Sequence, residues 1–259
     1  MSSSKPIGFL DSGIGGITVL RKTVMLLPNE DYFFYSDSAN NPYGDKSDEE
    51  IIKRCDELTD LLVNKKNCKA VVLACNTASA KAAEALREKY ADIPIIAIEP
   101  AYKMVHDNNP DGFTLVMATK GTLESEKFHR LFYTYYNNNT SLLACVGLAD
   151  LIEQDKQQEI RAYLSDNLKK YKGVAENVVL GCTHYPLAEK QIAEVLGSVR
   201  FFDGANGVSK QLKKILGERE LLSLKTEKGK IEFTDSSPSP EEQKHKKTRF
   251  FELLSEDNI

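Results

Sequence analysis

The chain carries the stretch Val71-Val72-Leu73-Ala74-Cys75-Asn76-Thr77-Ala78-Ser79 and, far downstream, its near-copy Val178-Val179-Leu180-Gly181-Cys182-Thr183-His184-Tyr185-Pro186. Each stretch opens with an apolar run without alternation, which is typical of a strand buried on both faces of a parallel sheet. Each run ends at a cysteine, and small or polar residues then lead into a predicted helix. Two such units predict an α/β fold that is built twice.

The spacing between the two halves supports an ancient duplication. Cys75 and Cys182 lie 107 positions apart (182 − 75), and Asp11 and Thr119, which follow two other predicted strands, lie 108 apart (119 − 11). We therefore expect an α/β protein of two pseudo-symmetric lobes, each a mostly parallel sheet flanked by helices, with the active site in the cleft between them. The first lobe is predicted to comprise residues 1–98 and 208–259, and the second residues 99–207.

The predicted elements follow this plan. Ser47 and Glu50 form the capping-box pattern of a helix start. We expect helices over 79–90 and 186–196, and one long helical stretch carrying Leu151 through Leu168. The C-terminal part has no counterpart in the second lobe, so we expect it to pack on the first. Apolar runs predict strands near residues 7–10, 32–35, 71–75, 95–98, 114–117, 141–145, 178–182, 199–202 and 230–233.

Composition argues against several classes of function. A hydrophobic content of 41% and a charged content of 28% fit a globular protein. The net charge of -4 gives no support to nucleic-acid binding, the apolar runs are too short to cross a bilayer, and the first residues lack the apolar core of a signal peptide. Five scattered cysteines and four histidines predict free thiols, with no zinc site. We expect a cytoplasmic protein that binds neither nucleic acid nor membrane.

The paired cysteines indicate a reaction with two faces. Ligands bind at the carboxyl ends of the strands of an open α/β sheet, and Cys75 and Cys182 both fall there. A racemase needs this arrangement, because one group removes a proton from one side of a carbon and its twin returns a proton from the other. Asp11 is placed to assist Cys75, and His184 to assist Cys182, with Glu153 as a possible partner of the histidine.

The residues after the cysteines suit an amino-acid substrate. Asn76-Thr77 and Thr183-His184 are expected at helix N-termini, where free N–H groups attract a carboxylate. Ser12 and the backbone of Pro42-Tyr43-Gly44 are candidates to hold a second carboxylate.

Each of these residues also has a purely structural interpretation. A cysteine after a buried strand is usually a small apolar residue, and Cys55, Cys68 and Cys145 are expected to be no more than that. Asp11 and the glycines at 13–16 fit a tight turn, and the loop lacks the phosphate-binding pattern. The run Lys244 to Lys247 is expected to be a solvated surface.

The motifs together resemble the glutamate racemases of the cofactor-independent aspartate/glutamate racemase superfamily. The matching stretches occur in the family's order over nearly the whole chain: 9–16, 37–44, 74–79, 98–100, 118–122 and 181–186. The resemblance implies interconversion of L- and D-glutamate for peptidoglycan synthesis, without pyridoxal phosphate or metal, by a homodimer. It implies that Cys182 takes the proton from L-glutamate and Cys75 from D-glutamate. The substrate-binding residues that it implies are Asp11, Ser12, Pro42, Tyr43, Gly44, Asn76, Thr77, Thr119, Thr183 and His184.

Three other hypotheses fit parts of the pattern. One is a racemase for aspartate or another small amino acid, and another is a silent amino-acid-binding module that tolerates serine at both cysteines. The third is a hydrolase with Cys182 as nucleophile and His184 as base. The duplication argues against the hydrolase, because a nucleophile needs no twin.

Overall fold

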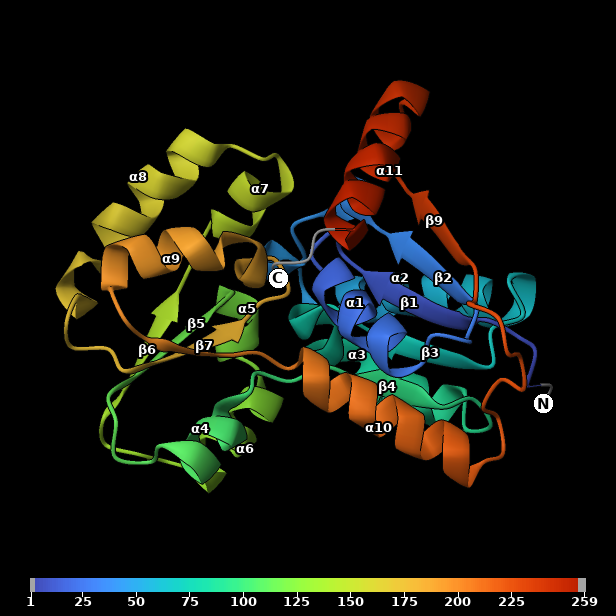
Figure 1. Cartoon of the computed structure of the whole chain (residues 1–259), viewed down its shortest axis with the longest axis horizontal. Helices are drawn as coiled ribbons and strands as arrows, with labels where there is room; N and C mark the ends of the chain where they lie inside the picture. Colours follow the sequence, from blue (N-terminus) through green and yellow to red (C-terminus); the bar gives the residue numbers. More distant parts are fainter. Residues whose placement is uncertain (1–2, 256–259) are drawn as a thin grey trace.

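The computed structural model, which describes residues 3–255, contains two parallel sheets (Figure 1). The first sheet has the strand order β4-β3-β1-β2-β9 and the second β6-β5-β7-β8, and every neighbouring pair is parallel. The strands are β1 (Ile7–Asp11), β2 (Tyr32–Ser36), β3 (Ala70–Leu73), β4 (Ile95–Ala97), β5 (Thr114–Ala118), β6 (Thr140–Ala144), β7 (Asn177–Gly181), β8 (Arg200–Phe202) and β9 (Ile231–Asp235).

Helices connect and cover these strands. The α-helices are α1 (Ile17–Leu26), α2 (Asp48–Asp60), α3 (Asn76–Lys89), α4 (Tyr102–Asn108), α5 (Lys120–Leu123), α6 (Glu126–Thr134), α7 (Leu148–Glu153), α8 (Gln157–Leu168), α9 (Glu189–Leu196), α10 (Ala205–Glu218) and α11 (Pro240–Ser255). Short 3₁₀ turns lie at Ser38–Asn40, Tyr43–Asp45, Lys169–Tyr171 and Tyr185–Ala188, and a π-helical turn, Leu61–Lys65, follows α2. Among the described residues, no helix is both long and apolar enough to span a membrane.

Each sheet is covered on both faces. Helices α1, α10 and α11 pack on one face of the first sheet, and α2 and α3 on the other. In the second sheet, α7, α8 and α9 cover one face and α4 and α6 the other (Figure 1). All residues of β1, β3, β5 and β7 are buried. This two-sided burial explains the apolar runs without alternation and confirms the predicted α/β class.

The C-terminal part returns to the first sheet. Strand β9 pairs with β2, and α10 packs against α1. Phe250 of α11 is fully buried, with its ring centroid 4.3 Å from that of Phe233 in β9 and 5.0 Å from that of Phe34 in β2. This aromatic cluster anchors α11 to the edge of the first sheet. The lobe boundaries near residues 98 and 208 stay a prediction.

Several predicted boundaries are wrong, for local reasons. Helix α3 begins at Asn76 instead of Ser79 because Cys75 is its N-cap and accepts a hydrogen bond from the Ala78 N–H (3.5 Å). The predicted helix from Pro186 begins as an α-helix only at Glu189, after a 3₁₀ turn.

The long helical stretch predicted through Leu168 is also broken. Asp155 has φ 55° between α7 and α8, a left-handed conformation that ends the first helix. Helix α4 was not predicted; its Tyr102 and Val105 face the core of the second lobe.

Candidate active site

Four strand ends of the two sheets meet at one place. Asp11 ends β1 and Cys75 follows β3, while Thr119 follows β5 and Cys182 follows β7. Several hydrogen bonds join the lobes there, two of them between residues beside these strand ends. The Thr183 hydroxyl donates to Asp11 Oδ2 (3.3 Å), and the hydroxyls of Thr77 and Thr119 lie 3.0 Å apart. The carboxyl ends of the two sheets therefore face each other, where α/β proteins bind their ligands.

Cys75 is a buried thiol at the start of a long helix. It is 6% exposed, and its Sγ lies 3.4 Å from Ser12 Oγ in addition to the capping bond from the Ala78 N–H. Burial and, after it, the Asp11 carboxylate raise the pKa of Cys75 to about 12, against the lowering effect of the Ala78 and Ser12 hydrogen bonds. Cys75 is therefore a thiol at neutral pH in this arrangement.

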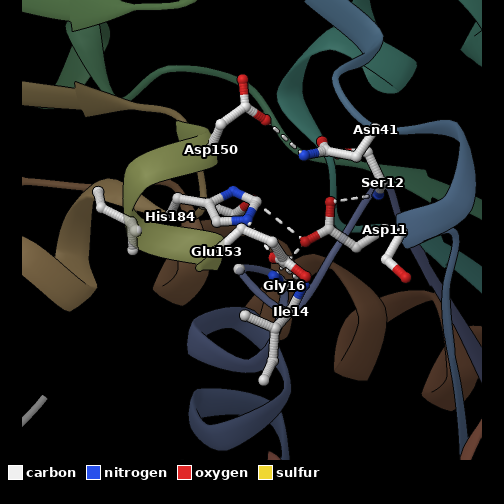
Figure 2. A network of polar contacts seen from close by, with 12 residues as sticks. Asp11, Ser12, Ile14, Gly16, Asn41, Asp150, Glu153 and His184 are labelled. Carbon is white, nitrogen blue, oxygen red and sulfur yellow. Dashed lines mark hydrogen bonds and ion pairs between the residues drawn. The ribbon is translucent and has the colours of Figure 1, made fainter. Parts of the chain in front are cut away.

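Cys182 has a different environment. It is 7% exposed, and its Sγ lies 3.8 Å from Nδ1 of His184. The other ring nitrogen of His184, Nε2, hydrogen-bonds to Glu153 Oε2 at 2.8 Å (Figure 2). Three of the predicted catalytic residues therefore lie in one chain of contacts. Glu153 is buried rather than solvated, at 8% exposure.

The charges of His184 and Glu153 stabilise each other. Burial alone lowers the pKa of His184, but the contacts with Cys182 and Glu153 outweigh it and hold the pKa well above 6.5. Burial alone raises the pKa of Glu153, but His184, Lys246 and the Ile14 N–H outweigh it and lower the pKa to about 2. The pair is therefore an imidazolium and a carboxylate at neutral pH.

Two further groups fix the Glu153 carboxylate. The Ile14 N–H donates to Oε2 (2.8 Å), and Lys246 Nζ in α11 lies 3.1 Å from Oε1. The expectation that the 244–247 run is only a solvated surface is therefore wrong for Lys246. The spacing of Lys246, Arg249 and Phe250 places all three on adjoining parts of one helix face, but nothing in the sequence marks Glu153 as the partner of Lys246.

Asp11 is held by backbone groups. Oδ1 accepts from the Ser12 N–H (2.8 Å), and Oδ2 accepts from the Gly16 N–H and the Thr183 hydroxyl. Burial raises the pKa of Asp11 to about 6, against the lowering effect of His184 and the two backbone N–H groups. Asp11 acts on Cys75 through its charge, while Ser12 makes the hydrogen bond to the thiol.

The glycines after Asp11 permit a close approach between the lobes. A Cβ on Gly13 would lie 2.4 Å from Glu153 Oε2, and one on Gly15 would lie 2.6 Å from His184 Nδ1 and 2.7 Å from its backbone N. Such distances leave no room for any side chain. The loop is therefore more than a tight turn, because it lets the first lobe touch the His184–Glu153 pair.

The loop at 42–44 turns its backbone toward the second lobe. The hydroxyl of Tyr43 donates to Asp37 Oδ2 (2.7 Å), and Arg54 donates to both oxygens of Asp37 (2.9 and 2.7 Å). A Cβ on Gly44 would lie 3.4 Å from the Thr119 side chain. The side chain of Tyr43 is thus committed to the first lobe. No role was predicted for the Asp37–Arg54 pair, whose partners lie 17 positions apart.

Hydroxyl and amide groups complete the site. Thr77, Thr119 and Thr122 form a cluster with Oγ–Oγ distances of 3.0, 2.9 and 3.3 Å. Asn76 is 4% exposed, and its Oδ1 has no hydrogen-bond partner among the described residues. The buried carbonyl oxygen is an acceptor that a ligand N–H can satisfy. Thr122 was not predicted, because nothing in its spacing marks it.

No group of three or more histidine, cysteine, aspartate or glutamate side chains within residues 3–255 is arranged to hold a metal ion. All five cysteines are free and buried. The site presents two thiols, an imidazolium–carboxylate pair, a carboxylate with a raised pKa and several hydroxyls. That inventory fits proton transfer at carbon.

Two α/β lobes that face each other, with a buried thiol at matching strand ends, define an enzyme of the racemase class. The family model for Asp/Glu/hydantoin racemases matches residues 7–208. The chain belongs to this family, and it is an isomerase.

Two glutamate racemases are similar in sequence to this chain over most of their length. The glutamate racemase of Clostridium novyi (strain NT) is 43% identical over 242 residues, which cover 92% of this chain and 93% of the relative. The glutamate racemase of Clostridium perfringens (strain SM101 / Type A) is 42% identical over 236 residues, covering 89% and 90%.

Solved structures of glutamate racemases have the same fold as this chain. The glutamate racemase of Francisella tularensis in complex with D-glutamate has a TM-score of 0.81 at 28% identity, over 96% of this chain and 94% of that one. Isoform RacE1 of Bacillus anthracis glutamate racemase has a TM-score of 0.83 at 28% identity, over 96% and 95%.

Proposed function

We propose that the chain interconverts L- and D-glutamate by deprotonation and reprotonation at Cα, with one cysteine on each face of the substrate. The observation that carries this proposal is the pair of buried sulfurs at matching strand ends, each with its own polar partner. The relatives named above are glutamate racemases, which supports glutamate as the substrate.

The two thiols differ in a way that suits reaction with L-glutamate. Cys182 lies beside the His184 imidazolium, whose positive charge stabilises a thiolate. The thiolate takes the Cα proton, and the electron pair stays on Cα and its carboxylate. Cys75, held as a thiol, then donates its proton to the opposite face of Cα, which forms D-glutamate and leaves Cys75 as thiolate.

The reverse reaction uses the same groups in opposite protonation states. Cys75 takes the proton from D-glutamate, and Cys182 returns one on the other face. Ser12 hydrogen-bonds to the Cys75 sulfur and stabilises its thiolate, while the nearby Asp11 carboxylate makes that thiolate more basic.

Polar groups around the sulfurs are proposed to bind the substrate. The N-terminus of α3, at Asn76 and Thr77, attracts a carboxylate through its free N–H groups, and Thr119 and Thr183 supply hydroxyls from the second lobe. The unpartnered Asn76 Oδ1 is an acceptor for the substrate ammonium group. Ser12 and the backbone of 42–44 are proposed to hold the side-chain carboxylate.

We propose that this reaction needs neither pyridoxal phosphate nor a metal. The α-proton of an amino acid is weakly acidic, so the protein must stabilise the developing negative charge by hydrogen bonds in a site that excludes water. Both sulfurs are buried, as are Asp11, His184 and Glu153, and this burial strengthens each of those interactions.

The cellular role follows from the product. We propose that the enzyme supplies D-glutamate for peptidoglycan in the cytoplasm of a bacterium and works as a homodimer. The family to which the chain belongs supports this role.

The test is racemisation of L-glutamate by the purified protein, followed by loss of optical rotation, after exhaustive dialysis against a chelator and without added pyridoxal phosphate. We expect racemisation of glutamate and a much slower reaction with aspartate and alanine. Cys75→Ser and Cys182→Ser should each abolish it, because serine is a far weaker acid than cysteine. A serine variant with normal turnover would remove that cysteine from the mechanism.

A further inference from the structure

Two basic side chains of helix α11, which packs on the first lobe, contact the second lobe beside the Cys182 half of the site. Helix α11 is fixed to the first sheet by Phe250, which packs between the rings of Phe34 and Phe233. From the same helix, Lys246 and Arg249 extend to the end of α7 in the second lobe. Lys246 binds the Glu153 side chain, and Arg249 donates to the backbone carbonyls of Ile152 (2.8 Å) and Glu153.

The two carboxylate oxygens of Glu153 bind different partners. Oε2 accepts from His184 Nε2 and from the Ile14 N–H, both at 2.8 Å, whereas Oε1 is bound by Lys246 at 3.1 Å. A carboxylate bound at both oxygens has one orientation, and that orientation aims Oε2 at the imidazole ring. The ring then directs Nδ1 at Cys182, 3.8 Å away.

We propose that Lys246 is a positioning residue for the Cys182 half-reaction, because it fixes Glu153 and through it the His184 ring. Lys246 is 16% exposed and touches neither sulfur, so its effect passes through Glu153 alone. The inference rests on the proposed two-thiol function.

Other charged groups surround the same ring. Asp11 acts on His184 from β1, and Asp150 acts on it from α7, where it accepts a hydrogen bond from Asn41 (2.7 Å; Figure 2). Lys246 and Arg249 are the cations that α11 brings to the end of α7. Loss of Lys246 leaves the carboxylates in excess and frees Glu153 to rotate, so the ring loses its fixed direction.

The test compares Lys246→Met with Lys246→Arg and with Lys247→Met, a neighbouring exposed lysine on the same helix as a matched control. Because the two enantiomers have equal free energy, any variant must lower kcat/KM equally in both directions. We expect a loss of about tenfold for Lys246→Met, by misplacement of a reacting group. We expect recovery of most of that loss in Lys246→Arg and no change in Lys247→Met.

Isotope effects separate a positioning role from a merely structural one. If the Cys182 step alone slows, the effect with Cα-deuterated L-glutamate rises, because its C–D bond breaks in the slow step. The effect with Cα-deuterated D-glutamate falls to the smaller equilibrium value, because its C–D bond breaks before that step. Isotope effects in Lys246→Met that match the wild type, or an unchanged kcat/KM, would overturn the inference.

A second readout needs no substrate. The Nε2 proton of His184, held by Glu153, should exchange with solvent about tenfold faster in Lys246→Met than in the wild type, as measured by NMR. If Lys246→Met does not fold, Lys246→Gln takes its place, since glutamine fits the partly exposed position without the charge. Racemisation by the wild type tests the proposed function separately, and unchanged exchange in the variant contradicts the inference whatever that result.

Discussion

Asp11→Asn should change the pH dependence of stability in a defined direction. Burial raises the pKa of Asp11 from 3.8 to about 6, which corresponds to about 3 kcal/mol of folding free energy. Between about pH 4 and pH 6 the folded protein binds this proton and the unfolded chain does not, so the free energy of unfolding falls as the pH rises. Above about pH 6 the wild type is destabilised by the full free-energy cost of ionising the buried Asp11 side chain. The asparagine variant has no such cost, because asparagine does not titrate.

The expected result is a difference that grows with pH. Asparagine cannot accept from both the Ser12 and Gly16 N–H groups, so the variant has a constant cost of its own. Between about pH 4 and pH 7 the variant should nevertheless gain about 3 kcal/mol relative to the wild type. Urea unfolding at several pH values measures this, with the exposed Asp166→Asn as control. Parallel stability curves for Asp11→Asn and wild type would refute the raised pKa.

Three further changes test other parts of the structure. Gly15→Ala should reduce racemisation more than about a hundredfold with little loss of helix by circular dichroism, because its Cβ would lie 2.6 Å from His184 Nδ1; near-normal turnover would contradict the close approach. Lys69→Met should lower the free energy of unfolding by about 3–5 kcal/mol, because it leaves Glu30 charged, buried and without its 2.5 Å partner; a loss below about 1 kcal/mol in urea unfolding would show that the pair is not buried. Phe250→Ala should cost about 3–5 kcal/mol by calorimetry, because it removes the anchor of α11; an unchanged Tm would show that α11 is not fixed there.

Much of the fold could be predicted because the central strands are buried on both faces. Such strands show as apolar runs without alternation, and each ends near a chemistry-bearing residue such as Asp11 or Cys75. The capping box at Ser47 and Glu50 was equally visible, and both of its hydrogen bonds are present. Boundaries failed where a tertiary or side-chain contact decides them, as at Cys75, which caps α3.

The sequence predicted most of the residues that the structure brings together at the candidate site, but few of their contact partners. Cys75, Cys182, Asp11 and His184 stand next to strand ends, so local sequence reveals them. Contacts between distant segments have no local signal, and the 93 positions between Glu153 and Lys246 hid their ion pair. The matching positions of the two cysteines also concealed a difference, since one caps an α-helix and the other precedes a 3₁₀ turn.

Deuterium incorporation at Cα tests the central claim most directly. Each enantiomer of glutamate is incubated separately with the protein in D2O, and samples are taken during the first few per cent of the reaction. The two enantiomers in each sample are separated, and their deuterium content is measured by mass spectrometry. A two-base mechanism predicts that the product enantiomer carries one deuterium at Cα while the remaining substrate keeps its hydrogen. The same result is expected whichever enantiomer is the starting material. Product that retains the substrate's hydrogen, or label that enters both enantiomers at the same rate, would contradict a thiol on each face of the substrate.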